Sequence, residues 1–242
     1  MWRWLPVVVA GLVVAAVAGI ALAFPSVAAT TCPTCYDMRQ VRPGLYLESG
    51  LPAARERQVA EVIDAAHRRV ADFYGGRRSS PDILACLTAS CYRRIGGGGE
   101  RGIAVLNRTI MLSPGGVNPV IASHEMSHVE LHARLGFGAV PLPQWFDEGL
   151  AAVVSDDPRH LKPDTAGDRC RVPEGEAPPQ TLDDWLRTAK ADPDAYAKAA
   201  CRVSRWLRAN GGPGAVLELI EQVAGGGELP ASLRATSNEA PS

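Results

Sequence analysis

The sequence carries almost no net charge. Its 25 Lys and Arg residues are balanced by 26 Asp and Glu residues, which leaves a formal charge of -1. Nucleic-acid-binding domains need a basic surface field, so this composition excludes that class of function. Gly (24) and Pro (19) are too few for a low-complexity chain, and 46% hydrophobic residues suffice to build a core. No internal repeat is present, and a length of 242 residues fits one domain with at most a small appendage.

Charge is also missing from residues 5–23, which read LPVVVAGLVVAAVAGIALA. About 20 apolar residues are enough to cross the hydrocarbon core of a membrane. Trp2 and Trp4 precede this run, where membrane anchors carry interfacial aromatic residues. A cleaved secretory signal is the alternative, with residues 27–29 (Val-Ala-Ala) as the cleavage site. Residues 1–30 are therefore predicted as a transmembrane anchor or signal segment, with the rest at a bacterial periplasm or cell surface, or secreted.

The six cysteines agree with export, because an even number of cysteines in an oxidising compartment usually forms disulfides. Proximity along the chain favours the pairs Cys32–Cys35, Cys86–Cys91 and Cys170–Cys201. The first pair encloses only two residues, so a redox-active pair or half of a zinc site is an alternative there. A redox cysteine needs a helix N-terminus to stabilise its thiolate, and no strand leads into one at this position. A structural disulfide is therefore the favoured interpretation.

The remaining residues predict an α+β fold. A juxtamembrane segment over residues 31–50 leads to a helix that opens at Pro52 and carries apolar residues every three to four positions up to Phe73. Strands are expected over residues 82–87, 102–106 and 109–112. Helices separated by Gly and Pro turns follow over about 118–136, 144–154, 181–190, 193–210 and 213–224. A helix and a small sheet followed by a run of helices gives a domain over residues 51–228, with a disordered tail over 229–242.

The segment HEMSH, residues 124–128, lies inside the first of these later helices. Two histidines four positions apart are separated by about 40° around a helix and about 6 Å along it, so both imidazoles can reach one ion. Zinc binds neutral imidazole nitrogen and keeps an open position for water when three protein groups bind it. Glu125 is placed to take a proton from that acidified water. The sequence therefore predicts His124 and His128 as ligands of one Zn²⁺ and Glu125 as the base.

A third ligand is expected from the second helix, in the segment WFDEGLAA. His132 lies about 12 Å along the axis from His124, too far to share an ion with it, and is expected to be a polar neighbour. The residues from Gly136 to Pro143 offer a reversal that would lay the second helix antiparallel to the first. Asp147 is the competing carboxylate, expected to be solvent-exposed, but Glu148 has the longer reach. We predict Glu148 as the ligand, with a solvated carboxylate at the helix start as the alternative for this residue.

The segments HEMSH and WFDEGLAA resemble the motifs of the gluzincin zinc metallopeptidases, the group of thermolysin and aminopeptidase N. The resemblance spans about residues 100–210 and implies a minimal catalytic core with a helical zincin subdomain. In that family the first motif supplies two His ligands and the Glu base, and the second supplies the Glu ligand. The aminopeptidases also carry an oxyanion-stabilising Tyr in a YxKG stretch, which residues 196–200 (YAKAA) resemble. The resemblance implies that Tyr196 donates a hydrogen bond to the oxyanion.

Two departures from the family limit what the resemblance implies about the substrate. The ligand spacing is one residue longer than in aminopeptidase N, and no GxMEN-like segment is present to grip a free amino terminus. Residues 102–112 are expected to offer an edge strand that pairs with an extended peptide. We expect a zinc metallopeptidase that holds one Zn²⁺ per chain, acts on a peptide or protein and contacts the membrane through its N-terminal helix. The alternative is a non-catalytic module of the same fold that binds a partner at the envelope.

Overall fold

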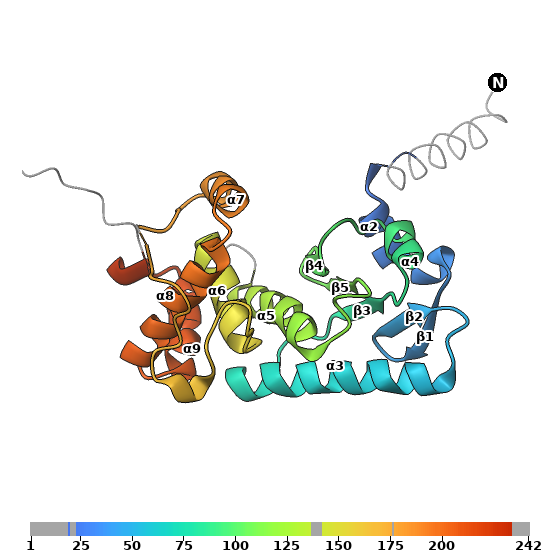
Figure 1. Cartoon of the computed structure of the whole chain (residues 1–242), viewed down its shortest axis with the longest axis horizontal. Coiled ribbons are helices and arrows are strands. Elements are labelled where there is room, and N and C mark those ends of the chain that lie inside the picture. Colours follow the sequence, from blue (N-terminus) through green and yellow to red (C-terminus); the bar gives the residue numbers. More distant parts are fainter. Residues whose placement is uncertain (1–18, 20–22, 137–141, 176, 234–242) are drawn as a thin grey trace, which may run out of the picture. The chain divides into compact units, whose positions relative to one another are not determined.

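The computed structural model describes residues 19, 23–136, 142–175 and 177–233, which have the predicted α+β fold (Figure 1). They divide into two compact units. Unit 1 comprises residues 1–61 and 81–118, and unit 2 comprises residues 62–80 and 119–242. The predicted anchor over residues 5–23 lies almost entirely outside the described part of the chain. Within that described part, no helix is long and apolar enough to cross a membrane.

Unit 1 contains one mixed sheet. Its strands are β1 (Met38–Arg42), β2 (Leu45–Glu48), β3 (Asp82–Ala85), β4 (Gly102–Val105) and β5 (Thr109–Leu112). Their order is β1-β2-β3-β5-β4, with β2, β3 and β5 parallel and the two outer pairs antiparallel. Parallel strands are usually covered on both faces, which explains why every residue of β5 is buried and apolar side chains fill the centre of the sheet.

Three short helices and the first part of a long helix complete unit 1. They are α2 (Pro25–Thr31), the 3-10 helix η2 (Pro33–Tyr36), α4 (Ala89–Arg94) and the first part of α3 (Ala53–Tyr74). The Arg39 side chain of β1 pairs with Glu56 of α3, and Arg42 donates to the Ala60 carbonyl oxygen at 3.4 Å. The core of the unit brings together residues of α2, the sheet and α4: Ala29, Met38, Leu84, Cys86, Cys91, Tyr92, Ile95, Val105 and Met111.

Three strands appear where the sequence predicts them, and two do not. The predicted ranges 82–87, 102–106 and 109–112 correspond to β3, β4 and β5. Strands β1 and β2 lie within residues 31–50, for which the sequence predicts a juxtamembrane segment and no strand pattern is evident. Both are only four or five residues long, and β1 reads MRQVR with a single fully buried side chain, Met38. Such a short and mostly polar edge strand carries no recognisable alternation.

The three disulfides are those that proximity in the sequence predicted: Cys32–Cys35, Cys86–Cys91 and Cys170–Cys201. The second one lies in the core of unit 1, where it joins the end of β3 to α4. Thr88 caps α4 by accepting a hydrogen bond from the Cys91 N–H at 3.2 Å. The third disulfide, in unit 2, joins Cys201 of helix α8 (Ala195–Ala209) to Cys170, which precedes helix α7 (Leu182–Ala191) in the chain.

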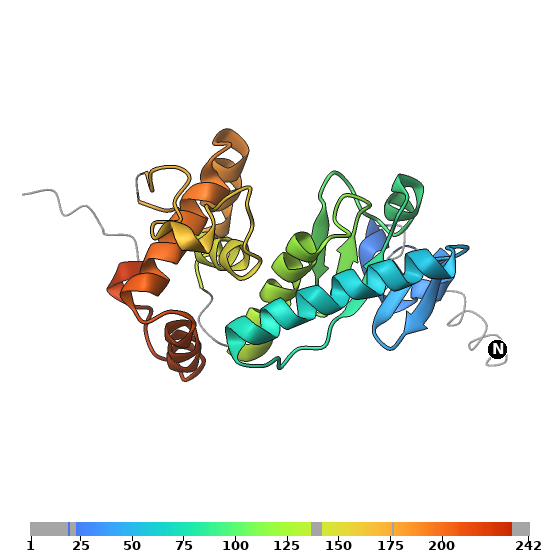
Figure 2. The same cartoon turned by 60° about the horizontal axis from the view of Figure 1, so that its bottom comes forward.

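Unit 2 is helical. Besides the last part of α3, it consists of α5 (Pro119–Leu135), α6 (Gln144–Val154), α7 (Leu182–Ala191), α8 (Ala195–Ala209), α9 (Pro213–Ala224) and the 3-10 helices η3 (Asp164–Ala166) and η4 (Ala231–Leu233). The five α-helices agree with their predicted ranges to within two residues. Helices α5 and α8 both pack against α6, as Figures 1 and 2 show. Of the predicted disordered tail, residues 234–242 lie outside the described part, and residues 231–233 form η4.

Candidate metal centre

Helix α5 carries the HEMSH segment through the interior of unit 2, with most of its residues buried, His124 and Glu125 among them. Buried polar side chains need hydrogen-bond partners, and Ser123 and Ser127 have them, whereas His124 Nδ1 has none in the described part of the chain. The Ser123 hydroxyl donates to the Pro119 carbonyl oxygen at 2.7 Å, and the Ser127 hydroxyl lies 3.2 Å from the Tyr74 hydroxyl. The helix is therefore held by polar contacts as well as by apolar packing.

Glu130 forms the strongest of these anchoring contacts. Its carboxylate is completely buried and accepts hydrogen bonds from the Ser79 N–H at 2.9 Å, the Ser79 hydroxyl at 2.6 Å and Arg134 Nε at 2.6 Å. Burial favours the neutral acid, but these bonds and one from the Arg78 N–H lower the pKa of Glu130. The anionic side chain thus ties the loop after α3 to the helix that carries the candidate ligands.

The three predicted ligands converge at one point. Glu148 Oε2 lies 3.3 Å from His124 Nε2 and 3.6 Å from His128 Nε2. All three donor atoms lie within 4.8 Å of one another. The Glu148 side chain is only 15% exposed, so it is not the solvated carboxylate that the sequence left as an alternative.

The spacing of these atoms fits zinc. Zinc–nitrogen and zinc–oxygen bonds of about 2.0–2.1 Å in a tetrahedron place neighbouring ligand atoms about 3.3–3.4 Å apart. Of the two nitrogen–oxygen distances at the site, the 3.3 Å distance equals that value and the 3.6 Å distance is slightly longer. Gln144 Nε2 donates to the other carboxylate oxygen of Glu148, Oε1, at 3.2 Å. This contact holds the carboxylate so that Oε2 is the atom that faces the imidazoles.

Asp147 is buried, which makes the expectation of a solvent-exposed side chain wrong. Its side chain turns to the far edge of the imidazoles: Oδ1 lies 2.7 Å from His128 Nδ1, and Oδ2 lies 3.0 Å from His132 Nε2. When only Nδ1 of His128 carries a proton, donated to Asp147, the Nε2 atom 3.6 Å from Glu148 Oε2 keeps a lone pair that a metal ion could use. His132 is thus a polar neighbour of the site, held by the carboxylate that orients His128.

At this site the acidic and basic side chains stabilise each other's charged forms. Burial favours neutral His128, but the Asp147 and Glu148 carboxylates outweigh it and raise the pKa of His128 well above its usual value. Burial would likewise favour neutral Asp147, yet His128 and His132 lower its pKa to about 2. The site therefore attracts positive charge, and a metal cation has to compete with a proton on His128.

Gly149, directly after Glu148, allows α8 to pack closely against the part of α6 that carries Glu148. A Cβ atom at this position would lie 2.5 Å from the Ala199 carbonyl oxygen and 2.8 Å from Val203 Cγ2. No side chain fits there, so the backbone of α8 packs directly on the turn of α6 that carries Glu148. This close approach gives a physical reason for the Glu-Gly pair in the second motif.

Tyr196 lies in the first turn of α8, close enough to the candidate centre for the charges of Glu148 and Glu125 to act on its hydroxyl. Burial raises its pKa to about 12, with further contributions from the negative charges of Glu148 and Glu125. The phenol therefore keeps its proton near neutral pH and can act as a hydrogen-bond donor. Its ring stacks on His160 at a centroid distance of 5.7 Å and meets the Trp185 ring edge-on at 5.2 Å.

Comparison with protein-family models, curated proteins and solved structures found no match. The gluzincin resemblance therefore rests on the motifs quoted above, and its relevance to this chain rests on the geometry of the centre. A second group of potential ligands, Glu48 with Cys86 and Cys91, offers no thiolate because both sulfur atoms belong to one disulfide.

Sequence reasoning missed two neighbours of the centre. His160 and Trp185 enclose the Tyr196 ring, but one lies in a turn after α6 and the other within α7. Burial, with smaller contributions from Arg159 and His124, lowers the pKa of His160 although Asp157 opposes this, so its imidazole is neutral at pH 7. Neither residue belongs to a motif, and only the fold brings them to α8.

Asp147→Asn is expected to weaken zinc binding about 10- to 100-fold, as other substitutions behind a metal-bound histidine do. The amide removes the negative charge behind His128 Nδ1 and lowers the basicity of Nε2, the nitrogen that would bind a metal ion. Competition with a chromophoric zinc chelator measures the affinity. The matched control is Asp183→Asn, at an exposed position in the first turn of α7, which should bind zinc as the wild type does. Equal affinity in Asp147→Asn would show that Asp147 does not support a ligand.

Proposed function

We propose that the protein is a zinc metallopeptidase that hydrolyses peptide bonds outside the cytoplasm. The observation that carries this proposal is the convergence of His124 Nε2, His128 Nε2 and Glu148 Oε2 at a spacing that suits zinc. A bound zinc ion would supply Lewis acidity toward a water molecule and toward the carbonyl group of the scissile peptide. The remaining steps belong to side chains of unit 2.

Glu125 is the general base in this proposal. It follows His124 on the buried helix α5 and lies close enough to Tyr196 for its charge to raise the pKa of that phenol. Its carboxylate accepts a proton from the attacking water while the water oxygen bonds to the peptide carbon. The same carboxyl group then returns the proton to the amine nitrogen as the carbon–nitrogen bond breaks.

Tyr196 is the oxyanion donor. When water adds to the peptide carbon, the carbonyl oxygen gains negative charge and needs a nearby hydrogen-bond donor. The Tyr196 phenol remains protonated because its pKa is raised to about 12. Its ring is fixed between His160 and Trp185, so the donor is positioned before the reaction begins. A preorganised donor of this kind is worth about 2.7–4 kcal/mol in the transition state.

The three disulfides support a location in an oxidising compartment. Residues 5–23 would bring the chain there, either as a retained anchor or as a cleaved signal. The substrate would then be a peptide or protein at the cell envelope.

The proposal is tested with the full-length chain loaded with zinc. We expect it to hold one zinc ion and to cut an unfolded protein such as casein, with fragments identified by mass spectrometry. Removing the metal with 1,10-phenanthroline should stop cleavage, and adding zinc after dialysis should restore it. If the zinc-loaded chain leaves a broad panel of unfolded proteins intact, the peptidase proposal fails and the non-catalytic envelope module is favoured.

A further inference from the structure

Exposed apolar side chains of unit 1 gather in one region of its fold. Among the described residues of this unit, the large hydrophobic side chains that are exposed are Phe24 at 59%, Ile103 at 40% and Leu106 at 69%. Phe24 directly precedes α2, Ile103 lies in β4, and Leu106 begins the turn between β4 and β5. Because β4 contacts α2, side chains that are far apart in the sequence belong to the same region.

The register of the sheet places Ile103 on the face that α2 and α4 cover. Ile103 is paired with Met111 of β5, and paired residues of neighbouring strands direct their side chains to the same face. Met111 belongs to the core cluster that joins the sheet to α2 and α4. Gly96, just after α4, lies so close to α2 that an added Cβ atom would be 2.5 Å from the Ser26 nitrogen. In Figure 1, α2 and α4 therefore lie together on one side of the sheet, with the first part of α3 on the other.

The turn that carries Leu106 is unfavourable for this side chain. Leu106 and Asn107 both have a φ angle of 52°, and the Arg108 N–H donates to the Val105 carbonyl oxygen at 3.1 Å. A turn with two left-handed residues is usually built from Asn and Gly, because a bulky side chain there crowds the backbone. Packing within the chain gives little in return, since Leu106 is largely exposed. A bulky apolar residue in such a conformation indicates a contact outside the chain.

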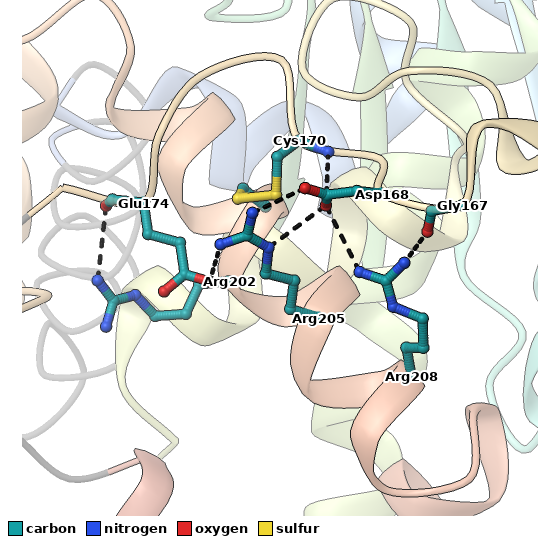
Figure 3. Close-up of a disulfide and its surroundings, with 8 residues drawn as sticks. Gly167, Asp168, Cys170, Glu174, Arg202, Arg205 and Arg208 are labelled. Atoms are coloured by element: carbon teal, nitrogen blue, oxygen red, sulfur yellow. Dashed lines mark hydrogen bonds and ion pairs between the residues drawn. A yellow bond between two sulfur atoms is a disulfide. The ribbon is translucent and has the colours of Figure 1, made fainter.

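The same region of unit 1 is positively charged. Residues 89–112, from α4 to β5, contain four arginines and one acidic residue, although the whole chain has a net charge of -1. Arg93, Arg101 and Arg108 are exposed, and in the described part of the chain no carboxylate pairs with them. Figure 3 shows the opposite case in unit 2, where two arginines of α8 reach the Asp168 carboxylate. The three arginines of unit 1 are therefore available to an anionic partner.

The part of the chain that precedes this region indicates what the partner is. Residues 5–23, the predicted membrane anchor, carry no charge, and Phe24 follows them directly. Helix α2 has seven residues and is about 10 Å long, so β4, which contacts it, lies near the point where the chain would leave the bilayer. Apolar side chains combined with arginines are typical of surfaces that lie at the interface of a membrane with anionic lipids.

We propose that unit 1 docks on the bilayer through one face. This membrane face consists of Phe24, Arg93, Arg101, Ile103, Leu106 and Arg108. Its apolar side chains enter the headgroup layer, and its guanidinium groups bind the phosphates of anionic lipids. The predicted anchor alone would tether unit 1, whereas docking also fixes which face it turns toward the bilayer. This inference goes beyond the proposed peptidase function and does not depend on it.

A fluorescent label at position 106 tests the contact, using the full-length chain in phosphatidylglycerol vesicles. All six cysteines form disulfides, so Leu106→Cys supplies a single thiol for an environment-sensitive dye. We expect blue-shifted emission and strong quenching by nitroxide-labelled lipids, because the dye lies in the headgroup layer. The control is Ala54→Cys, an exposed position of α3 on the other side of the sheet, whose dye should remain unquenched. Equal quenching at the two positions, or none at position 106, would overturn the proposal.

The role of the arginines is tested in the same labelled chain. Arg101→Gln and Arg108→Gln should each lower the docking equilibrium constant, measured from the fluorescence lifetimes, about fivefold, since a basic side chain near an anionic surface contributes about 1 kcal/mol. Phosphatidylcholine vesicles should also weaken docking, whereas the control Arg57→Gln, at an exposed position of α3, should not. Docking that ignores both the arginines and the lipid charge would overturn the anionic-lipid assignment. A blue shift that follows the density of chains instead of the lipid would reveal a contact between two copies and would overturn the membrane face.

Discussion

Glu125→Gln is expected to lower kcat for peptide hydrolysis about 100- to 10,000-fold while the chain keeps its zinc. The amide has nearly the same shape as the carboxylate but cannot take a proton from water. His124, His128 and Glu148 are unchanged, so the three donor atoms that face one another at 3.3 and 3.6 Å still hold the metal. Zinc content by mass spectrometry and initial rates of peptide cleavage give the two measurements.

The matched control for this experiment is Glu218→Gln, an exposed carboxylate on α9, which should keep wild-type activity. A Glu125→Gln variant with full zinc content and full activity would remove Glu125 from the mechanism. Loss of zinc together with loss of activity would instead assign Glu125 a role in holding the metal.

Tyr196→Phe is expected to lower kcat about 100- to 1,000-fold with little change in KM or zinc content. The phenyl ring keeps the stacking with His160 and the edge contact with Trp185, so the local fold is preserved. Only the hydroxyl donor is lost, and the oxyanion needs that donor mainly in the transition state. Steady-state kinetics on one quenched fluorescent peptide separate the two constants.

Tyr46→Phe provides the matched control, because Tyr46 is a partly buried tyrosine that packs against the core of unit 1. It should leave both kinetic constants unchanged. An increase in KM without a decrease in kcat for Tyr196→Phe would show that the hydroxyl binds substrate equally well in the ground state, and the oxyanion role would be wrong.

The helices of unit 2 were predictable because their apolar positions recur every three to four residues between Gly and Pro turns. The His124–His128 pair was predictable for a related reason: a spacing of four residues fixes the relative positions of two side chains on a helix before any tertiary structure is known. Predicting that Glu148 lies near these histidines required more information, because its position depends on how α6 packs against α5. The motif WFDEGLAA indicated the carboxylate that faces the two imidazoles, and Gly149 shows one physical constraint behind that motif.

The environment of the centre was not predictable from local patterns. Asp147 reads as an exposed acidic residue in the first turn of a helix, yet it is buried because two histidines of α5 share its carboxylate. His160 and Trp185 come to Tyr196 only through the packing of separate segments. Strands β1 and β2 were missed because each is very short and gains its stability from neighbouring strands. In each case tertiary contacts decide the outcome.

The central claim is that two imidazoles and one carboxylate of unit 2 hold a single zinc ion. Zinc K-edge X-ray absorption on the full-length chain with one equivalent of zinc tests it most directly. We expect a four-coordinate ion with two imidazole nitrogens at about 2.0–2.1 Å and two oxygens at about 2.0–2.2 Å, one from Glu148 and one from solvent. A spectrum with sulfur neighbours, or with oxygen neighbours and no imidazole scattering, would contradict the claim.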